Sequence, residues 1–443
     1  MEGRMATAAL PDVSQQDSLE RSTIRRVFWR IVPFLVLAYI ISQLDRSNIS
    51  IAAFQMNGDL KLGAAQYGLA AAIYYIPYCV LEIPSSWMLT RYGARRWISR
   101  IMISWGVVCI MMAFVKGPHS LYSVRFLLGA AEAGFYPGVI FYLSLWFPAR
   151  YRGRIFAVFS TALPIAYFVG SPIAAWLLEL DGFLTLRGWQ WLFIIESLPA
   201  ILFGFMFLRM MADGPEQASW LSPQQREWLT TTLSRDEQRS RPMESLSGWR
   251  SLCSSNVLGL SLVFSGSAGA TAALGLWMPQ ILKAFGLSNM SAALLNMLPY
   301  AAACAIMLWW GIASDRSDRS SRFWRTVLPL ILIGVSLTAT VFAKSLVASM
   351  VLLTLAFIGT YALKGPFWAL VSDWTPTPRA AMTIAQINAI SNLAGFGGTY
   401  LIGIIKDQTG SFALACLPLA ALAVIAAITL LLLNRMNNRM TTV

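Results

Sequence analysis

Long apolar blocks, separated by short polar segments, run through almost the whole chain of 443 residues. A helix of about 20 residues is long enough to cross the roughly 30 Å hydrocarbon core of a bilayer. The sequence holds twelve apolar blocks of about that length or more, at about 27–54, 66–90, 97–115, 120–146, 152–180, 189–211, 254–282, 290–313, 323–343, 346–371, 379–405 and 411–433. The pattern predicts an all-α membrane protein with twelve transmembrane helices.

A long polar stretch, rich in Ser, Gln, Arg and Glu, divides the predicted helices into six and six. We therefore expect two six-helix bundles joined by a linker, in the order N-terminal tail 1–26, first bundle 27–211, linker 212–251, second bundle 252–433 and C-terminal tail 434–443. Repeated bundles of six helices around a central site are one route to alternating access. This organisation favours a transporter.

Composition supports a membrane protein and excludes a soluble one. Hydrophobic residues make up 57% of the chain, charged residues only 12%, and the mean hydropathy is +0.59. The cations behind the net charge of +13 gather in the segments after the second, fourth, sixth and eighth blocks. Positive residues mark the cytoplasmic side, so we expect both termini in the cytoplasm and no nucleic-acid partner. The five cysteines lack metal-binding or disulfide spacing, so we expect no metal and no cofactor besides protons.

Two of the predicted helices carry an acid and a base at bilayer depth. Asp45 and Arg46 are adjacent in the first, and Arg125 and Glu132 lie seven residues apart in the fourth. A charge at that depth costs roughly 2.5–3.5 kcal/mol even on lenient scales, so it normally marks a pathway or a proton site. By depth, Asp45 and Arg125 could pair, while Glu132 lies about 10 Å deeper on nearly the same helix face. Two charge pairs point to movement of a charged solute.

These residue types suit coupled transport. A carboxylate such as Asp45 that pairs with arginine in one state and is desolvated in another changes its pKa by whole units, as a proton-coupling group must. Arg46 is always charged and can bind a carboxylate in bidentate fashion, which makes it a candidate ligand for an anionic solute. The alternative is a buried ion-pair network that only joins helices, which is an expensive way to gain packing.

The second half adds polar residues whose role the sequence leaves open. Lys364 lies four residues before Trp368, and hence on the same helix face. It could bind a second negative group of the substrate, or it could snorkel to water. Asn388 and Asn392 are one turn apart, and they could bond a substrate or simply join helices.

Two loops carry a weak internal repeat. Thr90 and Arg91 follow the second block, and Asp315 and Arg316 follow the eighth, each pair coming after a small residue and three others. The pattern resembles the loop motif of the major facilitator superfamily, although Thr90 stands where that motif has Asp. The motif implies a charge latch at the cytoplasmic gate, and the alternative is ordinary anchoring by positive residues. The Asp in the second copy favours the latch there.

Seven further segments are distinctive, namely LDRSNI at 44–49, RFLLGAAEAGFYP at 125–137, WFP at 146–148, GWQWLF at 188–193, GPFW at 365–368, the glycine-rich stretch 387–398 and TGSF at 409–412. Through these segments most of the chain resembles bacterial members of the anion:cation symporter family, within the major facilitator superfamily.

The resemblance implies the major facilitator fold and uptake of small organic anions with protons across the inner membrane of a bacterium. Substrates of the family include sugar acids, tartrate-like hydroxy acids and aromatic acids, and Lys364, which lies outside the family pattern, tilts the expectation toward a dicarboxylate. We expect a monomer whose partners are the organic anion and the lipid bilayer. The implied residue roles are protonation for Asp45 and Glu132, charge pairing or substrate binding for Arg46 and Arg125, and lining of the cavity for Tyr75, Trp368, Asn388 and Asn392.

A rival function is proton-coupled efflux of drugs or metabolites. Gly170 to Pro172 faintly resemble the glycine-proline signature of antiporters, but a helix kink explains them as well. Efflux of uncharged or cationic compounds would leave Arg46 and Arg125 unexplained. No pair of nucleophile and base stands out, so we do not expect an enzyme.

Overall fold

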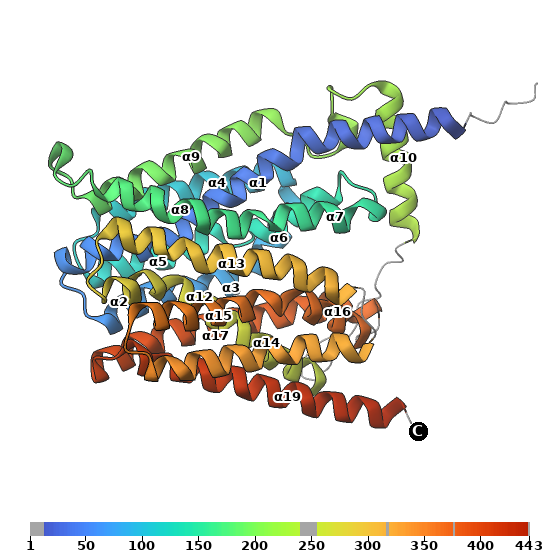
Figure 1. The fold of residues 1–443 in the computed structure, drawn as a ribbon. Coiled ribbons are helices and arrows are strands. Elements are labelled where there is room, and N and C mark those ends of the chain that lie inside the picture. Colours follow the sequence, from blue (N-terminus) through green and yellow to red (C-terminus); the bar gives the residue numbers. More distant parts are fainter. Residues whose placement is uncertain (1–12, 240–254, 316–318, 375–376, 442–443) are drawn as a thin grey trace, which may run out of the picture.

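The computed structural model describes residues 13–239, 255–315, 319–374 and 377–441. Within these ranges the regular elements are α-helices and short 3-10 turns. In Figure 1 the long helices run roughly along one direction, with the first half of the chain (blue to green) in one layer and the second half (yellow to red) beside it. The prediction of an all-α protein is confirmed.

In the first half, three of the predicted apolar blocks each form two consecutive helices. These pairs are α2 with α3, α5 with α6, and α7 with α8. The helices of this half are α1 (Val13–Asp59), α2 (Ala64–Ala72), α3 (Tyr75–Tyr92), α4 (Ala94–Met111), α5 (Pro118–Glu132), α6 (Phe135–Ser144), α7 (Ala149–Ser160), α8 (Ala162–Leu178) and α9 (Gly188–Met210).

The second half follows the helix α10 (Pro223–Arg239) in the predicted linker, and two of its blocks form pairs, α15 with α16 and α18 with α19. Its helices are α12 (Ser255–Lys283), α13 (Asn289–Asp315), α14 (Arg319–Ala339), α15 (Leu346–Ala362), α16 (Lys364–Trp374), α17 (Thr377–Thr409), α18 (Phe412–Ala415) and α19 (Leu417–Thr441).

Within the described residues, eleven helical segments are long and apolar enough to cross a membrane. The predicted block at 379–405 coincides with α17, which is not among them although it has 33 residues. Its Thr, Gln and Asn side chains lower its hydropathy. The count of twelve transmembrane helices, and the side of the membrane on which the termini lie, therefore stay predictions.

The breaks between paired helices meet one another in the first half. Gly134 follows the end of α5 with a φ of +86°, in the left-handed region that favours glycine. Gly129, one turn earlier, packs directly on the break between α2 and α3, because a Cβ there would lie only 2.2 Å from the carbonyl oxygen of Tyr74. The absence of a side chain at Gly129 therefore lets α5 pack closely against the break between α2 and α3.

The two halves pack through three main helix pairs, which are α2 with α17, α8 with α13, and α1 with α12. Figure 1 shows the start of α1, the linker helix α10 and the C-terminus at one end of the bundle, which we call the terminal end. The helix α2 lies toward the opposite end. This arrangement places the charged residues of α1 and α5 inside the first half and within reach of the boundary between the halves.

Candidate transport site

A buried charge cluster joins α1, α3 and α5 through Arg46, Glu132 and the Tyr74 at the start of α3. The Arg46 Nη2 atom lies 3.1 Å from Glu132 Oε1 and donates to the Tyr74 hydroxyl oxygen at 2.6 Å. The Tyr74 hydroxyl donates in turn to Glu132 Oε2 at 2.6 Å, and Ser42 Oγ donates to Oε1 at 2.7 Å. Three side chains therefore hydrogen-bond one carboxylate, as a buried charge requires.

The Arg46 guanidinium is held by aromatic rings and stays partly accessible. Its central carbon lies 4.9 Å from the ring centroids of both Tyr74 and Tyr78, which stack on each other with centroids 5.5 Å apart, so the cation meets two neighbouring aromatic rings. Its side chain is 20% exposed, whereas that of Glu132 is 2% exposed. Among the residues that the structure describes, Arg46 Nε has no hydrogen-bond partner. An anion that reached this point would meet Arg46 before Glu132.

Asp45 faces away from this cluster. It is buried, and its Oδ2 atom accepts a hydrogen bond from Trp105 Nε1 at 2.9 Å while Cys109 Sγ lies 3.6 Å from Oδ1. Adjacent helical residues diverge by about 100°, so when Arg46 points to α5, Asp45 points to α4. The pair of Asp45 and Arg125 that depth along the helices suggested does not form.

Arg125 instead caps the broken helix. Its Nε donates to the carbonyl oxygen of Ala70 at 3.2 Å and its Nη2 to that of Ala71 at 3.3 Å. These carbonyls belong to the last turn of α2, where a cation is favourable because the backbone oxygens lack helical partners. The guanidinium also lies 5.3 Å from the Tyr74 ring centroid. Arg125 therefore positions Tyr74 and is engaged by backbone in this structure.

The expected lining residues from the second half are separate from the charge cluster. Lys364 Nζ lies 4.2 Å from the Tyr361 ring centroid, and Trp368 packs on Phe264 with ring centroids 4.9 Å apart. Asn388 and Asn392 are half-buried. Within the described part of the chain, neither Asn nor Lys364 makes a hydrogen bond or ion pair with Arg46 or Glu132.

Tyr75 is the expected lining residue that lies at the boundary between the halves. It is buried, and its ring lies 3.7 Å from the position that a Cβ on Gly395 of α17 would take. Its ring also contacts Tyr74 edge-on, with centroids 5.5 Å apart. The tyrosine pair therefore links the charge cluster to the second half.

Sequence reasoning missed several members of the site. Ser42 lies one turn before Arg46, so helical spacing could have placed it in the site. Tyr74 and Tyr78 form a cluster with Tyr75 in the sequence, but the sequence does not say which of the three tyrosines line the cavity. No sequence signal connects Trp105 of α4 with Asp45. Glu196 of α9 was not chosen either, yet its side chain is buried beside Asn48 of α1.

The boundary between the halves is closed at the end opposite the termini. Asp407 of α17 accepts hydrogen bonds from the backbone N–H groups of Ala64 at 2.8 Å and Ala65 at 2.7 Å, which begin α2. The Tyr67 hydroxyl donates to the carbonyl oxygen of Leu276 at 3.0 Å. We call Asp407, Ala64, Ala65, Tyr67 and Leu276 the closed gate. A carboxylate at a helix N-terminus satisfies two orphan donors and interacts well with the helix dipole.

The loop motif residues are only partly described. Arg91 is exposed, and its guanidinium carbon lies 5.4 Å from the Trp87 ring centroid and 5.9 Å from that of Tyr92. It makes no ion pair within the described part of the chain. Arg316 and the side chain of Asp315 lie outside the described residues, so the latch stays a prediction.

Comparison with known proteins gives a consistent picture. A family model of the Major Facilitator Superfamily matches residues 35–399. The chain is 43% identical to a "Putative tartrate transporter" of Agrobacterium vitis over 417 residues, 94% of this chain and 96% of that protein. It is 34% identical to a "Quinolone resistance transporter" of Acinetobacter baumannii over 395 residues, 89% of this chain and 91% of that protein.

A solved structure shares the fold at low sequence identity. The crystal structure of a bacterial homologue of the human lysosomal transporter Spinster, in an inward-facing and occupied conformation, superposes with a TM-score of 0.75 at 17% identity. The match covers 91% of this chain and 96% of that one. The relatives and the shared fold are those of transporters. The chain therefore belongs to the Major Facilitator Superfamily.

Proposed function

We propose that this transporter imports a small organic carboxylate together with protons, as a member of the anion:cation symporter family in the inner membrane of a bacterium. The observation that carries the proposal is the Arg46–Glu132 ion pair, with a partly accessible cation beside a shielded acid. A tartrate-like hydroxy acid is the substrate class that the relatives favour, since two of them, 43% and 42% identical to this chain, are named "Putative tartrate transporter". No cofactor besides protons is required.

Exchange of partners at Arg46 is the chemical step. When Glu132 takes up a proton, its ion pair with Arg46 is lost, and the guanidinium becomes free to bind a substrate carboxylate in bidentate fashion. The neutralised charges lower the cost of closing apolar walls around the site. When Glu132 releases its proton, the internal ion pair forms again and displaces the anion.

Asp45 is the second proposed proton site, on the same helix but outside the cluster. It contacts Trp105 and Cys109 of α4, so a change in its protonation would alter the contact between α1 and α4. Two protons with a monoanion would carry one net charge inward, driven by about 2.3 kcal/mol per 100 mV. Two protons with a dianion would make the step electroneutral.

The second half completes the proposed cavity. Lys364 supplies a cation for a second carboxylate, and Asn388, Asn392 and Trp368 with Tyr75 supply polar and aromatic walls. With the termini in the cytoplasm, the closed gate is the outer gate and this conformation is inward-facing. Arg91, Asp315 and Arg316 then form the cytoplasmic latch of the opposite state, and a monomer is sufficient.

Efflux of drugs is the second candidate function, favoured by the 34% identity to the quinolone resistance protein. The two functions predict opposite responses to a pH gradient. Labelled tartrate is supplied outside proteoliposomes with an alkaline interior, into which a symporter accumulates it. A fluorescent quinolone is supplied outside proteoliposomes with an acidic interior, because a proton antiporter accumulates its substrate while protons flow out. Symport predicts that tartrate accumulates inside and that an uncoupler abolishes this. Uptake of tartrate that ignores the gradient, together with gradient-driven movement of the quinolone, would replace the proposal by efflux.

A further inference from the structure

The first helix begins at Val13, well before the first apolar block, and this early part carries a dense arginine surface at the terminal end. Arg21, Arg25, Arg26 and Arg30 lie within ten residues of α1, just where the first apolar block begins. Together with Ser22, Trp29 and Trp220 they line a shallow cavity of about 780 Å³. We call these seven residues the arginine surface. The transport mechanism makes no use of it.

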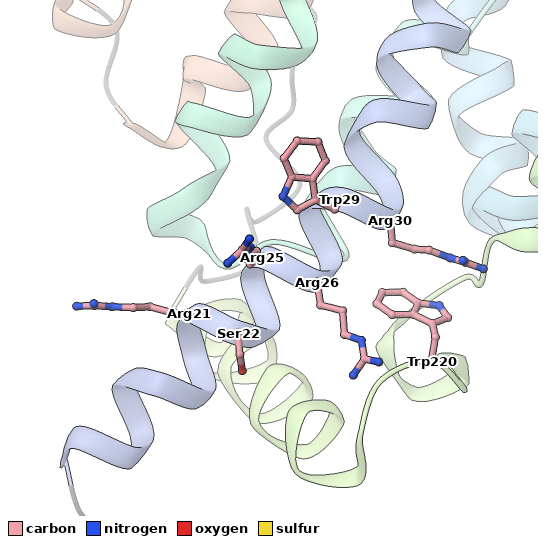
Figure 2. A pocket seen from close by; sticks show the side chains of 7 residues that line it. All are labelled: Arg21, Ser22, Arg25, Arg26, Trp29, Arg30 and Trp220. Atoms are coloured by element: carbon pink, nitrogen blue, oxygen red, sulfur yellow. The ribbon is translucent and has the colours of Figure 1, made fainter.

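Helical spacing divides this surface into two adjacent stripes. Ser22, Arg26 and Arg30 recur every four residues, and Arg21, Arg25 and Trp29 do the same one position earlier. Figure 2 shows Arg26 and Arg30 extending to the side where Trp220 lies, whereas Arg21 and Arg25 extend to the other side of the helix. Trp29 points away from Trp220. The positive charge therefore wraps around much of the helix.

The linker helix holds this surface in place. Arg26 Nη1 donates to Gln225 Oε1 at 3.3 Å, and Gln225 Nε2 lies 3.4 Å from Ser22 Oγ. The Trp220 ring stacks on Trp146 with centroids 5.4 Å apart. These contacts fix the arginine surface against the linker helix, so its cations are held close together.

Within the described residues, most of the charges on this surface have no acidic partner. Glu20, the nearest acid along the helix that faces its own bundle, is engaged by Arg150 and Tyr151 of α7. Within the described part of the chain, Arg21, Arg25 and Arg30 make neither an ion pair nor a hydrogen bond. Several unpaired arginines side by side repel one another, so they favour an external anion, and the planar guanidinium suits phosphate oxygens.

The aromatic residue beside them indicates where that anion comes from. Trp29 is 67% exposed at the start of the apolar block. An amphipathic ring in that position is typical of the headgroup level of a bilayer. Clusters of basic residues next to a transmembrane helix attract anionic lipids by about 1 kcal/mol for each Lys or Arg. A free phosphate ion would explain the arginines but not the exposed Trp29.

We propose that the arginine surface is a binding site for the phosphate headgroup of an anionic phospholipid, with Trp29 inserted at the bilayer surface. The site lies on α1, the continuous helix that also carries Asp45 and Arg46. A bound lipid would therefore hold the terminal end of the helix on which the transport residues sit. The proposal does not depend on which substrate is carried.

The test is the affinity of phosphatidylglycerol and of phosphatidylcholine for the purified full-length chain, measured by native mass spectrometry. Arg25→Gln/Arg30→Gln is the informative variant, because both residues are exposed and neither makes an ion pair or hydrogen bond with the described residues, so folding is retained. Two lost arginines predict about 30-fold weaker binding of phosphatidylglycerol. Arg96→Gln/Arg154→Gln, which removes the same charge from exposed positions outside the surface, is the matched control and is expected to bind as the wild type does.

Three results would overturn the proposal. The first is equal affinity of the wild type for the two lipids. The second is an equal loss in the control variant, which would mean that only overall charge matters. The third is inorganic phosphate competing as well as phosphatidylglycerol, which would identify a soluble anion as the occupant. The melting temperature of each variant checks that folding is unchanged.

Discussion

The closed gate offers a perturbation whose size can be worked out from two hydrogen bonds. Asp407 is the only acceptor shown for the N–H groups of Ala64 and Ala65 within the described residues, at 2.8 and 2.7 Å. Loss of such a cap costs about 1 kcal/mol, and loss of an anion at a helix N-terminus adds about 0.3–1 kcal/mol at an exposed position. Asp407→Ala should therefore weaken the gate by about 1–2 kcal/mol, or about 5- to 30-fold in the ratio of closed to open molecules.

Hydrogen exchange measured by mass spectrometry reports this shift. The expected result is faster exchange in α2 and in the end of α17, and slower exchange at the terminal end, where an opposite gate closes as this one opens. Exchange rates in Asp407→Asn should lie between those of Asp407→Ala and the wild type, since an amide oxygen still accepts one hydrogen bond. Gln408→Ala is the control at an exposed neighbour. If only the Ala64 and Ala65 amides respond, the contact is local and does not govern a gate.

Three further substitutions separate positioning from binding. Arg125→Met should lower the melting temperature, since a charged donor to backbone is worth about 1.5–3 kcal/mol, and an unchanged melting temperature with lost substrate binding would reverse its assignment as a cap. Gly129→Ala should destabilise by about 1–3 kcal/mol in thermal unfolding because its Cβ would collide with Tyr74, while Gly397→Ala, inside α17 with open space around it, should not destabilise. Arg46→Lys should fold normally but raise the Kd for a carboxylate by about tenfold or more in equilibrium binding, because an ammonium loses the bidentate geometry; retained affinity would argue against Arg46 as the ligand.

The overall architecture could be predicted because it depends on one strong signal. Apolar blocks of about 20 residues have few solutions other than membrane helices. The breaks within blocks could not be predicted in the same way. Gly134 is one glycine of 31, and only its left-handed backbone in the structure distinguishes it as a break.

The sequence predicted several residues of the candidate site, but it predicted few of the contacts between them. Charged residues at bilayer depth identified Arg46 and Glu132, which do pair. The depth of Asp45 in the helix does not predict which neighbouring helix its side chain faces. That direction depends on Trp105 and Cys109 of α4, which contact its carboxylate. Arg125 was harder still, since its partners are backbone carbonyls, which every residue has and no sequence pattern marks.

The most direct test of the central claim is pH-gradient-driven uptake of tartrate by proteoliposomes that hold Glu132→Gln. The amide keeps the shape of the side chain, but it stays neutral and cannot take up and release a proton as a carboxylate does. The account predicts that the variant still exchanges labelled for unlabelled substrate across the membrane, yet no longer accumulates it when a gradient is imposed. Glu179→Gln, at an exposed acid, should accumulate as the wild type does. Accumulation by Glu132→Gln at the wild-type level would contradict the claim that this carboxylate couples protons to the anion at Arg46.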